Sequence, residues 1–345
     1  MRLSRKWAVA LGAASGALLV RRAFPKFQFG GKVVVITGGS RGLGLVLARK
    51  LAAKGALLAI CARDAQELAR AQDELRGAGA YVLAFACDVG DPAQAQIFVD
   101  QVLQRFGRID VLINNAGIIQ VAPQEAMGLP DFHAVLSANF WGTVHTTLAA
   151  LPHMRARREG RVVNITSIGG AVAVPHLLPY SCSKFAATGF SEGLTAEVAK
   201  DGIRVTTILP SLMRTGSHVN ALFKGQRDEE MAWFSLGASA PGVSMQAERA
   251  ASRILAACAR GSPYVTLGVQ GKALRLVHAL FPGTTLRALS LVNRALPAVG
   301  AGSPSQAAEP GWQHRGKVRP SWLTRLGDAA ARRNREVPWA PPEPA

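Results

Sequence analysis

The sequence predicts an α/β fold, a doubly wound parallel sheet of about seven strands, followed by a helical C-terminal extension. Short apolar runs rich in β-branched residues alternate with longer segments of helical periodicity. A glycine-rich turn joins the first run to the first helix, and polar motifs follow the carboxyl ends of several later runs. In open parallel sheets this edge is where ligands bind. The sequence therefore predicts both a fold and the location of its site.

The predicted strands are short, and their continuous apolar character is typical of strands buried on both faces. The first begins at Lys32 and reads KVVVIT, so it carries four successive Val or Ile residues. Connections through helices make the neighbouring strands parallel, with right-handed crossovers. The seven predicted strands are 32–37, 57–61, 81–86, 110–113, 161–166, 204–209 and 264–267.

The segments between these strands have helical periodicity and few helix breakers. Asp64 precedes one of them and Glu67 follows three residues later, a spacing that is typical of a helix N-terminus. The predicted helices of this region include 45–53, 65–77, 92–106, 129–154 and 181–201.

Three glycines, Gly38, Gly42 and Gly44, form a TGxxxGxG turn directly after the first strand. Glycine permits the backbone to approach a ligand closely, because it has no Cβ. A strand, a glycine turn and a helix N-terminus together present backbone N–H groups to a pyrophosphate. We therefore expect a dinucleotide at this turn.

Tyr180 and Lys184 are four residues apart in YSCSK, so on a helix they share one face. An unperturbed phenol has a pKa of about 10. To act as a base near neutral pH it requires a pKa lowered by roughly three units. A neighbouring ammonium group in a desolvated pocket is one way to supply this, so the pair predicts acid–base catalysis.

With these motifs and NNAG at 114–117, the chain resembles the short-chain dehydrogenase/reductase family over residues 27–268. Asn139, Ser167, Tyr180 and Lys184 follow the order and approximate spacing of the catalytic tetrad of that family. The resemblance implies a Rossmann-like fold and an NAD(P)(H)-dependent oxidoreductase that interconverts a ketone or aldehyde and an alcohol.

The resemblance also implies a role for each member of the tetrad. Tyr180 exchanges a proton with the substrate oxygen, as general acid or base. Lys184 lowers the pKa of Tyr180 and holds the nicotinamide ribose, and Ser167 hydrogen-bonds the substrate oxygen. Asn139 holds a water that links Lys184 to solvent. A non-catalytic NADP(H)-binding scaffold or redox sensor is the alternative, but a pure binder has no need of Tyr180.

By the same resemblance, Asp88 hydrogen-bonds adenine, and Thr215 meets the nicotinamide carboxamide. The family usually has Gly after Pro210, where this chain has Ser211, so the geometry of that loop is open. The predicted cofactor-binding residues are Gly38, Ser40, Arg41, Gly42, Leu43, Gly44, Arg63, Asp88, Asn115, Ala116, Gly117, Tyr180, Lys184 and Thr215.

The second strand indicates which nicotinamide cofactor is used. An acid at its end would bind the ribose 2′-hydroxyl of NAD(H), but Ala62 stands there and Asp64 is predicted to cap a helix instead. Arg41 and Arg63 flank the expected ribose position, where two guanidiniums suit a 2′-phosphate. We therefore favour NADP(H) over NAD(H), with solvent-facing arginines as the alternative.

Apolar residues precede Tyr180 at 177–178, and others follow the last cofactor motif, in the stretch that forms the variable substrate loop of the family. They indicate a small apolar carbonyl or alcohol substrate, although the same residues could simply pack a lid. His176 is interpreted as a loop histidine. The residues concerned are Leu177, Leu178, Leu212, Met213, Leu222, Phe223, Met231, Trp233 and Phe234.

The net charge of +18 is carried by the flanks, because residues 27–252 have 21 bases and 18 acids. Residues 1–26 and 253–300 each have six bases and no acid. No nucleic-acid motif accompanies this charge, and the basic segments are also apolar, so a membrane surface is favoured over nucleic acid. Solubilising charge on flexible ends is the alternative.

Residues 1–26 form the first of four expected regions and contain an uncharged run over 7–20. As a helix this run spans about 21 Å, less than a hydrocarbon core of about 30 Å. We expect a shallow membrane anchor, with a packed helix or disorder as alternatives. A secretory signal is disfavoured, because no small-residue cleavage site is evident and export would remove the enzyme from its cofactor.

The catalytic domain is expected over 27–268 and an amphipathic helical extension over 269–300, with helices at 272–280 and 284–299. These helices cap the substrate side, touch a membrane, or both. Residues 301–345 are expected to be a basic, Pro-rich, flexible tail in which 323–335 could form a short helix.

The expected location is the cytoplasm, with membrane association at its cytoplasmic face. The four cysteines lack ligand spacing, so neither a metal nor a disulfide framework is expected. The resemblance implies a homo-oligomer formed through the helices that carry Asn139 and Tyr180, but the long C-terminal extension leaves the oligomeric state open.

Overall fold

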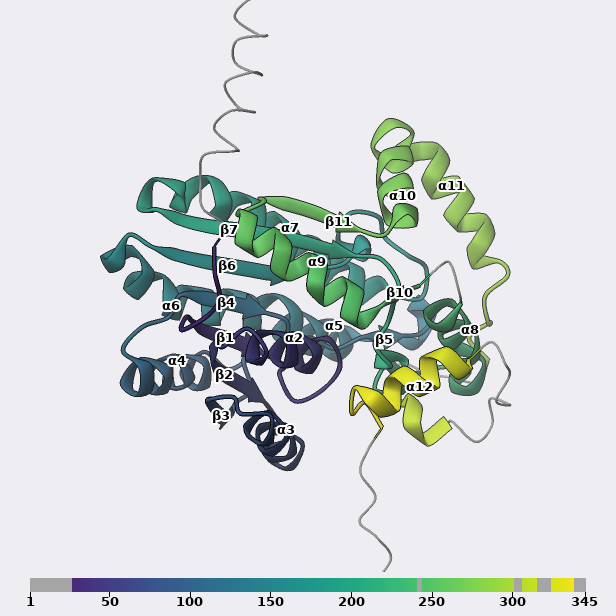
Figure 1. Cartoon of the computed structure of the whole chain (residues 1–345). Helices are drawn as coiled ribbons and strands as arrows, with labels where there is room; N and C mark the ends of the chain where they lie inside the picture. Colours follow the sequence, from purple (N-terminus) through teal and green to yellow (C-terminus); the bar gives the residue numbers. More distant parts are fainter. Residues whose placement is uncertain (1–26, 241–243, 301–305, 315–323, 338–345) are drawn as a thin grey trace, which may run out of the picture.

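A computed structural model describes residues 27–240, 244–300, 306–314 and 324–337. Its centre is a seven-stranded parallel sheet with the order β11-β7-β6-β4-β1-β2-β3 (Figure 1). The strand order reverses beside β1, as in a doubly wound sheet. The strands are β1 (Val33–Thr37), β2 (Leu57–Ala62), β3 (Val82–Ala86), β4 (Val111–Asn114), β6 (Gly160–Ile165), β7 (Ile203–Pro210) and β11 (Tyr264–Leu267). All seven predicted strands are confirmed.

Helices cover both faces of the sheet (Figure 1). Residues of α2, α3 and α9 join one buried apolar cluster, and residues of α4, α6 and α7 join the other. The helices are α2 (Gly42–Ala52), α3 (Ala65–Gly77), α4 (Pro92–Phe106), α5 (Leu129–Leu136), α6 (Gly142–Arg157), α7 (Leu178–Val198), α8 (Arg227–Ser239), α9 (Ala247–Arg260), α10 (Val269–Leu280), α11 (Pro282–Asn293) and α12 (Arg325–Arg333).

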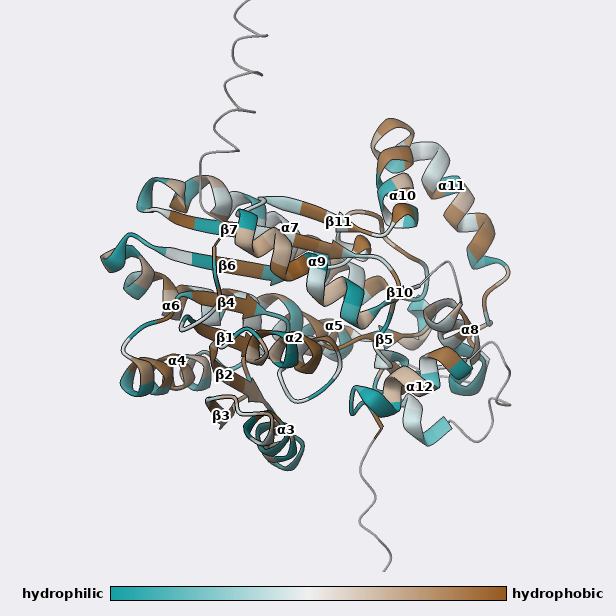
Figure 2. Cartoon of the chain, viewed as in Figure 1, coloured by the Kyte–Doolittle hydropathy of each residue, from teal (hydrophilic) through white to brown (hydrophobic). Residues whose placement is uncertain are grey.

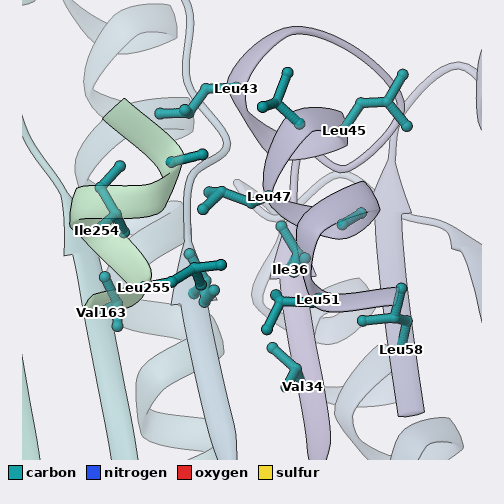
Figure 3. Packing of buried hydrophobic residues seen from close by; sticks show 14 of the residues in the cluster. Val34, Ile36, Leu43, Leu45, Leu47, Leu51, Leu58, Val163, Ile254 and Leu255 are labelled. Atoms are coloured by element: carbon teal, nitrogen blue, oxygen red, sulfur yellow. The ribbon is translucent and has the colours of Figure 1, made fainter. Parts of the chain in front are cut away.

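The first cluster is built where α2 and α9 lie against each other and against the sheet (Figure 3). Leu47 and Leu51 of α2 and Ile254 of α9 are inaccessible to solvent. Each such side chain contributes about 1.5–3 kcal/mol by leaving water. This packing fixes α2, and with it the glycine turn at its N-terminus.

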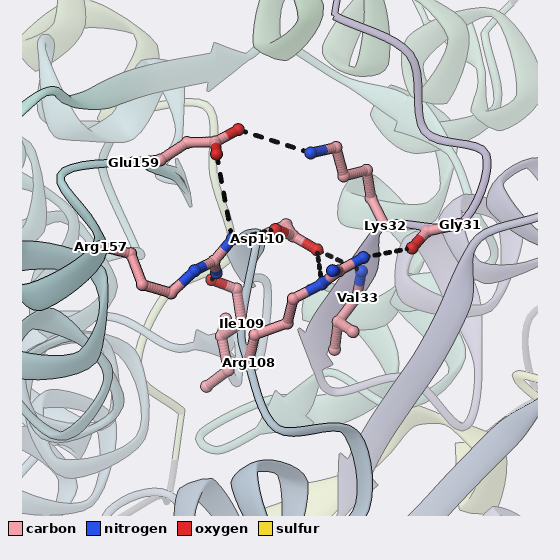
Figure 4. A network of polar contacts seen from close by, with 8 residues as sticks. All are labelled: Gly31, Lys32, Val33, Arg108, Ile109, Asp110, Arg157 and Glu159. Atoms are coloured by element: carbon pink, nitrogen blue, oxygen red, sulfur yellow. Dashed lines mark hydrogen bonds and ion pairs between the residues drawn. The ribbon is translucent and has the colours of Figure 1, made fainter.

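Asp110 organises the opposite edge, at the amino ends of the strands (Figure 4). Its buried carboxylate accepts hydrogen bonds from the Val33 N–H at 2.8 Å, Arg108 Nε at 3.0 Å and Arg157 Nη2 at 2.9 Å. Burial alone would raise the pKa of Asp110, but these donors together lower it. The network ties β1, β4 and α6 together, away from the predicted site.

One predicted helix, 129–154, is interrupted. The chain forms α5, then a π-helical turn at Ser137–Trp141, then α6. The turn contains Asn139, and π-turns inside α-helices are frequent at functional sites.

Small strands connect the substrate loop to the end of the chain. In one small sheet β9 (Leu222–Phe223) lies between β5 (Gln120–Val121) and β12 (Glu309–Pro310), and in another β8 (Met213–Arg214) pairs with β10 (Met245–Gln246). The stretch predicted to form the substrate loop is therefore held in place by hydrogen-bonded strands.

Two described parts of the segment expected to be flexible are packed. Residues 306–314 contact α8, where His314 Nδ1 lies 2.7 Å from Asp228 Oδ1 and Arg227 pairs with Glu309 at 2.9 Å. The predicted short basic helix is α12, and it also packs against α8. The expected anchor at 1–26 lies outside the described residues. Among the helices of the described ranges, none has the length and apolar character needed to span a membrane.

Candidate functional site

A cavity of about 680 Å³ opens at the carboxyl ends of the central strands and gathers nearly all predicted site residues. Gly44 and Asn139 lie behind its wall rather than on it. The predicted residues that line it are Gly38, Ser40, Arg41, Gly42, Leu43, Arg63, Asp88, Asn115, Ala116, Gly117, Ser167, Tyr180, Lys184 and Thr215.

The glycine turn depends on a very close approach between two of its own residues. A Cβ at Gly44 would lie 1.9 Å from the Gly38 carbonyl oxygen. Gly38 itself has φ of +65°, which glycine adopts without strain. Asn115 Nδ2 donates to the carbonyls of Gly38 at 3.0 Å and Thr37 at 3.1 Å. The NNAG motif thus holds the turn as well as lining the cavity.

Asp88 lies at the other end of the cavity, after β3. Its Oδ1 accepts from the Gly90 N–H at 2.9 Å, and its own N–H donates to Gln94 Oε1 at 2.9 Å. Asp88 is only partly buried, so one carboxylate oxygen remains available to a ligand. The role of Asp88 in binding adenine stays a prediction.

Tyr180 and Ser167 lie side by side near the middle of the cavity. Burial raises the pKa of Tyr180 above its usual value, and the Ser167 hydroxyl offsets part of that rise. Ser167 Oγ also accepts from the Gly169 N–H at 3.0 Å, which fixes its position. The phenol is therefore protonated at neutral pH, the state needed to donate a proton.

Lys184 is buried one helical turn further along α7. Its Nζ donates to the Ile165 carbonyl at 3.2 Å and lies 5.7 Å from the centroid of the Tyr180 ring. Burial lowers the pKa of Lys184 to about 8. The expectation that Lys184 lowers the pKa of Tyr180 is not met here, because the ammonium points to the carbonyl of β6.

The Asn139 side chain is committed to neighbouring groups. Its Oδ1 accepts from the Ile118 N–H at 2.7 Å, and its Nδ2 donates to the Ile118 carbonyl at 3.0 Å and to Ser183 Oγ at 2.9 Å. Both amide hydrogens are thus used. A water on this side chain could only donate to the second lone pair of Oδ1.

The two arginines predicted to flank the ribose differ in the structure. Arg63 is exposed on the rim of the cavity. Arg41 instead donates to both carboxylate oxygens of Glu67, at 2.8 and 2.9 Å. Asp64 caps α3 as predicted, accepting from the N–H groups of Gln66 and Glu67 at 2.9 Å each. Glu67 thus binds Arg41 rather than completing the cap.

Thr215 and Ser211 occupy the loop after β7. Thr215 is buried, and its Oγ1 accepts from the Ser217 N–H at 3.2 Å. Ser211, the departure from the family pattern, is accommodated by a glycine opposite. Its Oγ would lie 2.3 Å from a Cβ at Gly268, which has φ of +87°.

The substrate end of the cavity is mostly apolar. Trp233 and Phe234 of α8 and Leu274 of α10 line it, and the role of α10 as a cap on the substrate side stays a prediction. Glu230 of α8 is buried and does not line the cavity. Its carboxylate accepts a hydrogen bond from Trp233 Nε1 at 2.6 Å and lies 2.7 Å from His176 Nδ1. His176 therefore links the loop before Tyr180 to α8. The other apolar lining residues of this end are Ile118, Ile119, Val174, Leu177, Leu212 and Met213.

Among the cavity residues that were not predicted are Asn220 and Glu336. Glu336 is buried, and Asn220 Nδ2 donates to its Oε2 at 2.6 Å. In the sequence, Glu336 is recognisable only as an acid that follows a predicted short basic helix. That position gives no indication that its side chain lies in the cavity wall.

The helices expected to form an oligomer leave large apolar side chains exposed. Trp141, Leu148 and Phe185 are each between 42% and 56% accessible. The oligomeric state stays a prediction.

Residues 32–224 match the protein family that is described as short chain dehydrogenase. Granaticin polyketide synthase putative ketoacyl reductase 1 from Streptomyces violaceoruber is 38% identical over 53% of this chain and 68% of its own length.

Solved structures agree with this relationship. A short-chain dehydrogenase/reductase from Burkholderia phymatum, in complex with NAD, is 27% identical with a TM-score of 0.68, over 74% of this chain and 95% of its own. A gluconate 5-dehydrogenase from Burkholderia cenocepacia, in complex with NADP and tartrate, is 28% identical with a TM-score of 0.63, over 72% and 98%. Relatives of this fold thus bind either dinucleotide.

The close approach in the glycine turn gives a testable consequence. Gly44→Ala should lower the free energy of unfolding by about 3 kcal/mol, because the new methyl group collides with the Gly38 carbonyl. Gly193→Ala is the control, because nothing lies within 4 Å of its Cβ position in α7. That change should stabilise the helix by about 0.5–1 kcal/mol. Urea unfolding followed by circular dichroism measures both, and equal effects would contradict the close approach.

Proposed function

Since the chain belongs to the short-chain dehydrogenase/reductase family and is an oxidoreductase that acts on alcohol or carbonyl groups with NAD(P)(H), we propose that it reduces an apolar ketone or aldehyde with NADPH. The arrangement of Ser167, Tyr180 and Lys184 at one point of the cavity is the observation that carries this proposal. The bound dinucleotide supplies the hydride, and the side chains manage the charge and the proton.

Ser167 and Tyr180 can both donate a hydrogen bond to a carbonyl oxygen. Such donors stabilise the negative charge that develops on the oxygen as its carbon is reduced. Because burial raises its pKa, the Tyr180 phenol carries a proton at neutral pH and can transfer it to that oxygen. Lys184, with a pKa of about 8, remains mostly cationic at neutral pH, and its ammonium lies 5.7 Å from the centroid of the Tyr180 ring.

An apolar substrate is supported by the walls of the cavity beyond Tyr180. Trp233, Phe234 and Leu274 present hydrophobic surface from two helices, α8 and α10. A pocket of this kind favours a ligand that buries apolar area, with Ser167 and Tyr180 fixing its one polar atom.

The role of Tyr180 is tested by Tyr180→Phe. Turnover of a panel of aliphatic, aromatic and steroidal ketones, followed by NADPH absorbance, should fall by at least about 10²-fold, because the proton donor is removed. The Kd for NADPH should change little, since the ring remains. Cys182→Ser, an exposed change on the same helix, is the control. Undiminished turnover in the Phe variant would contradict the mechanism.

NADP(H) is proposed as the preferred cofactor. The supporting features are Ala62 in place of an acid at the end of β2 and the exposed guanidinium of Arg63 on the cavity rim. Arg41 is less suited than the sequence suggested, because Glu67 already binds it.

A cofactor comparison tests this assignment. kcat/KM should be higher with NADPH than with NADH, and Arg63→Ala should lower only the NADPH value, by about tenfold for one charge-assisted hydrogen bond. Arg105→Ala is the control, because Arg105 stacks on Tyr81 outside the cavity. A preference for NADH would overturn the assignment.

We also propose that α10 and α11 contact the cytoplasmic face of an anionic membrane. They extend away from the sheet as a pair and carry several hydrophobic residues (Figure 2). Val269, Leu280 and Leu291 are each more than 60% exposed, and no acid occurs between 253 and 300. Exposed apolar area with basic residues suits an interfacial helix.

Vesicle flotation of the full chain tests this surface. Binding should require phosphatidylserine in phosphatidylcholine vesicles and should weaken in Leu280→Glu. Leu129→Glu is the control, because Leu129 is 73% exposed on α5, away from the helix pair. Deleting residues 1–26 separates the contribution of the N-terminal segment. Equal binding by both Glu variants without that segment would contradict the proposal.

A further inference from the structure

The C-terminal segment 324–337, consisting of α12 and the residues that follow it, reaches the mouth of the cavity. Gly42 donates its N–H to the Asn334 carbonyl at 2.8 Å. Asn334 Nδ2 donates to the Thr215 carbonyl at 3.0 Å. Asn334 therefore joins the glycine turn to the loop that contains Thr215. A bound dinucleotide is expected to lie between this turn and this loop.

The carboxylate of Glu336 lies inside the glycine turn. A Cβ at Gly42 would be 2.2 Å from its Oε1, so the carboxylate fills the space that the missing side chain leaves open. Its Oε2 lies 3.5 Å from Arg41 Nε and accepts from Asn220 Nδ2 at 2.6 Å. The side chain is 7% exposed. A carboxyl group is thus held at the N-terminus of α2, and burial raises its pKa to about 7, so it is partly ionised at neutral pH.

This is the place where a pyrophosphate would be bound. Helix N-termini and the N–H groups of glycine turns bind anions. Here the Gly42 N–H already has Asn334 as its acceptor, and Arg41 lies between Glu67 and Glu336. A carboxylate beside a pyrophosphate repels it, and the Asn334 carbonyl occupies the Gly42 N–H that a phosphate oxygen would use.

We propose that residues 334–337 are an intramolecular competitor of the dinucleotide: Glu336 holds the anion site of the glycine turn in the free protein, and cofactor binding displaces it. This inference rests on the proposed function, because it requires the cavity to bind a dinucleotide.

The contacts of the segment fit a hinge after α12. Within the helix Ala330 and Ala331 are buried, and a Cβ at Gly216 would lie 2.3 Å from the Ala331 Cα, so α12 is firmly docked. Beyond it, Arg335 has φ of +57°, an uncommon conformation for a residue with a side chain. It is held by an ion pair with Glu74 at 2.7 Å. The proposal requires residues 334–337 to leave while α12 stays, which breaks the hydrogen bonds of Asn334 and the ion pair between Arg335 and Glu74.

A clamp is the rival interpretation, in which Glu336 stays and hydrogen-bonds the bound cofactor. The two interpretations predict opposite signs. For a competitor, removing the charge of Glu336 strengthens cofactor binding, and the cofactor loosens the segment. For a clamp, removing the charge weakens binding, and the cofactor protects the segment.

The first experiment measures the Kd of NADPH and of NADH for the full chain by calorimetry. Glu336→Gln is nearly isosteric, and it should bind both dinucleotides at least about fivefold more tightly than the unmodified chain. Glu248→Gln is the control, because Glu248 pairs with Arg333 at 3.2 Å outside the cavity. It should leave both Kd values unchanged. Unchanged or weaker binding by Glu336→Gln would overturn the competitor.

The second experiment needs no variant. Trypsin cleavage after Arg335, followed by mass spectrometry, should become faster when NADPH is added, because Glu336 has left the turn. Slower cleavage would favour the clamp and overturn the proposal. If neither chain binds either dinucleotide, the proposed function itself fails. If the unmodified chain and Glu336→Gln bind NADPH equally and the cofactor does not change cleavage, the proposed function stands and only the competitor proposal is overturned.

Discussion

The close contact between Gly44 and the Gly38 carbonyl is the constraint on which the site depends. It lets β1 pass into α2 with no side chain in between, and Asn115 holds the resulting turn through two hydrogen bonds. The packing of α2 on α9 keeps the helix N-terminus in that position (Figure 3). The anion site, the cofactor cavity and the place of Glu336 all follow from this one geometry.

The strands, and the cavity residues that follow them in the sequence, could be predicted because their signals are local. A run such as VVVI indicates a buried strand wherever it occurs, and the end of each strand places the motif that follows it. The helix from Ala65 to Gly77 was predicted with its observed bounds because Asp64 marks its start. The interruption of the helix at Asn139 was missed, since a π-turn arises from tertiary packing and carries no residue signature.

The charge pairs of the site could not be predicted, because they join residues far apart in the chain. Arg41 meets Glu67 across two elements, and Glu336 reaches the same turn from the opposite end of the sequence. Local spacing even favoured a different role for Glu67, as part of a helix cap. Likewise, the composition of residues 301–345 resembles a linker, although strand pairing with β9 orders part of it.

Ser211 and Gly268 have a consequence for engineering these two loops. The serine hydroxyl occupies the space that a side chain at 268 would need, and the positive φ of Gly268 itself favours glycine. A larger residue introduced at 268 would therefore meet a steric clash and a backbone penalty together, and removing the serine hydroxyl would relieve only the first.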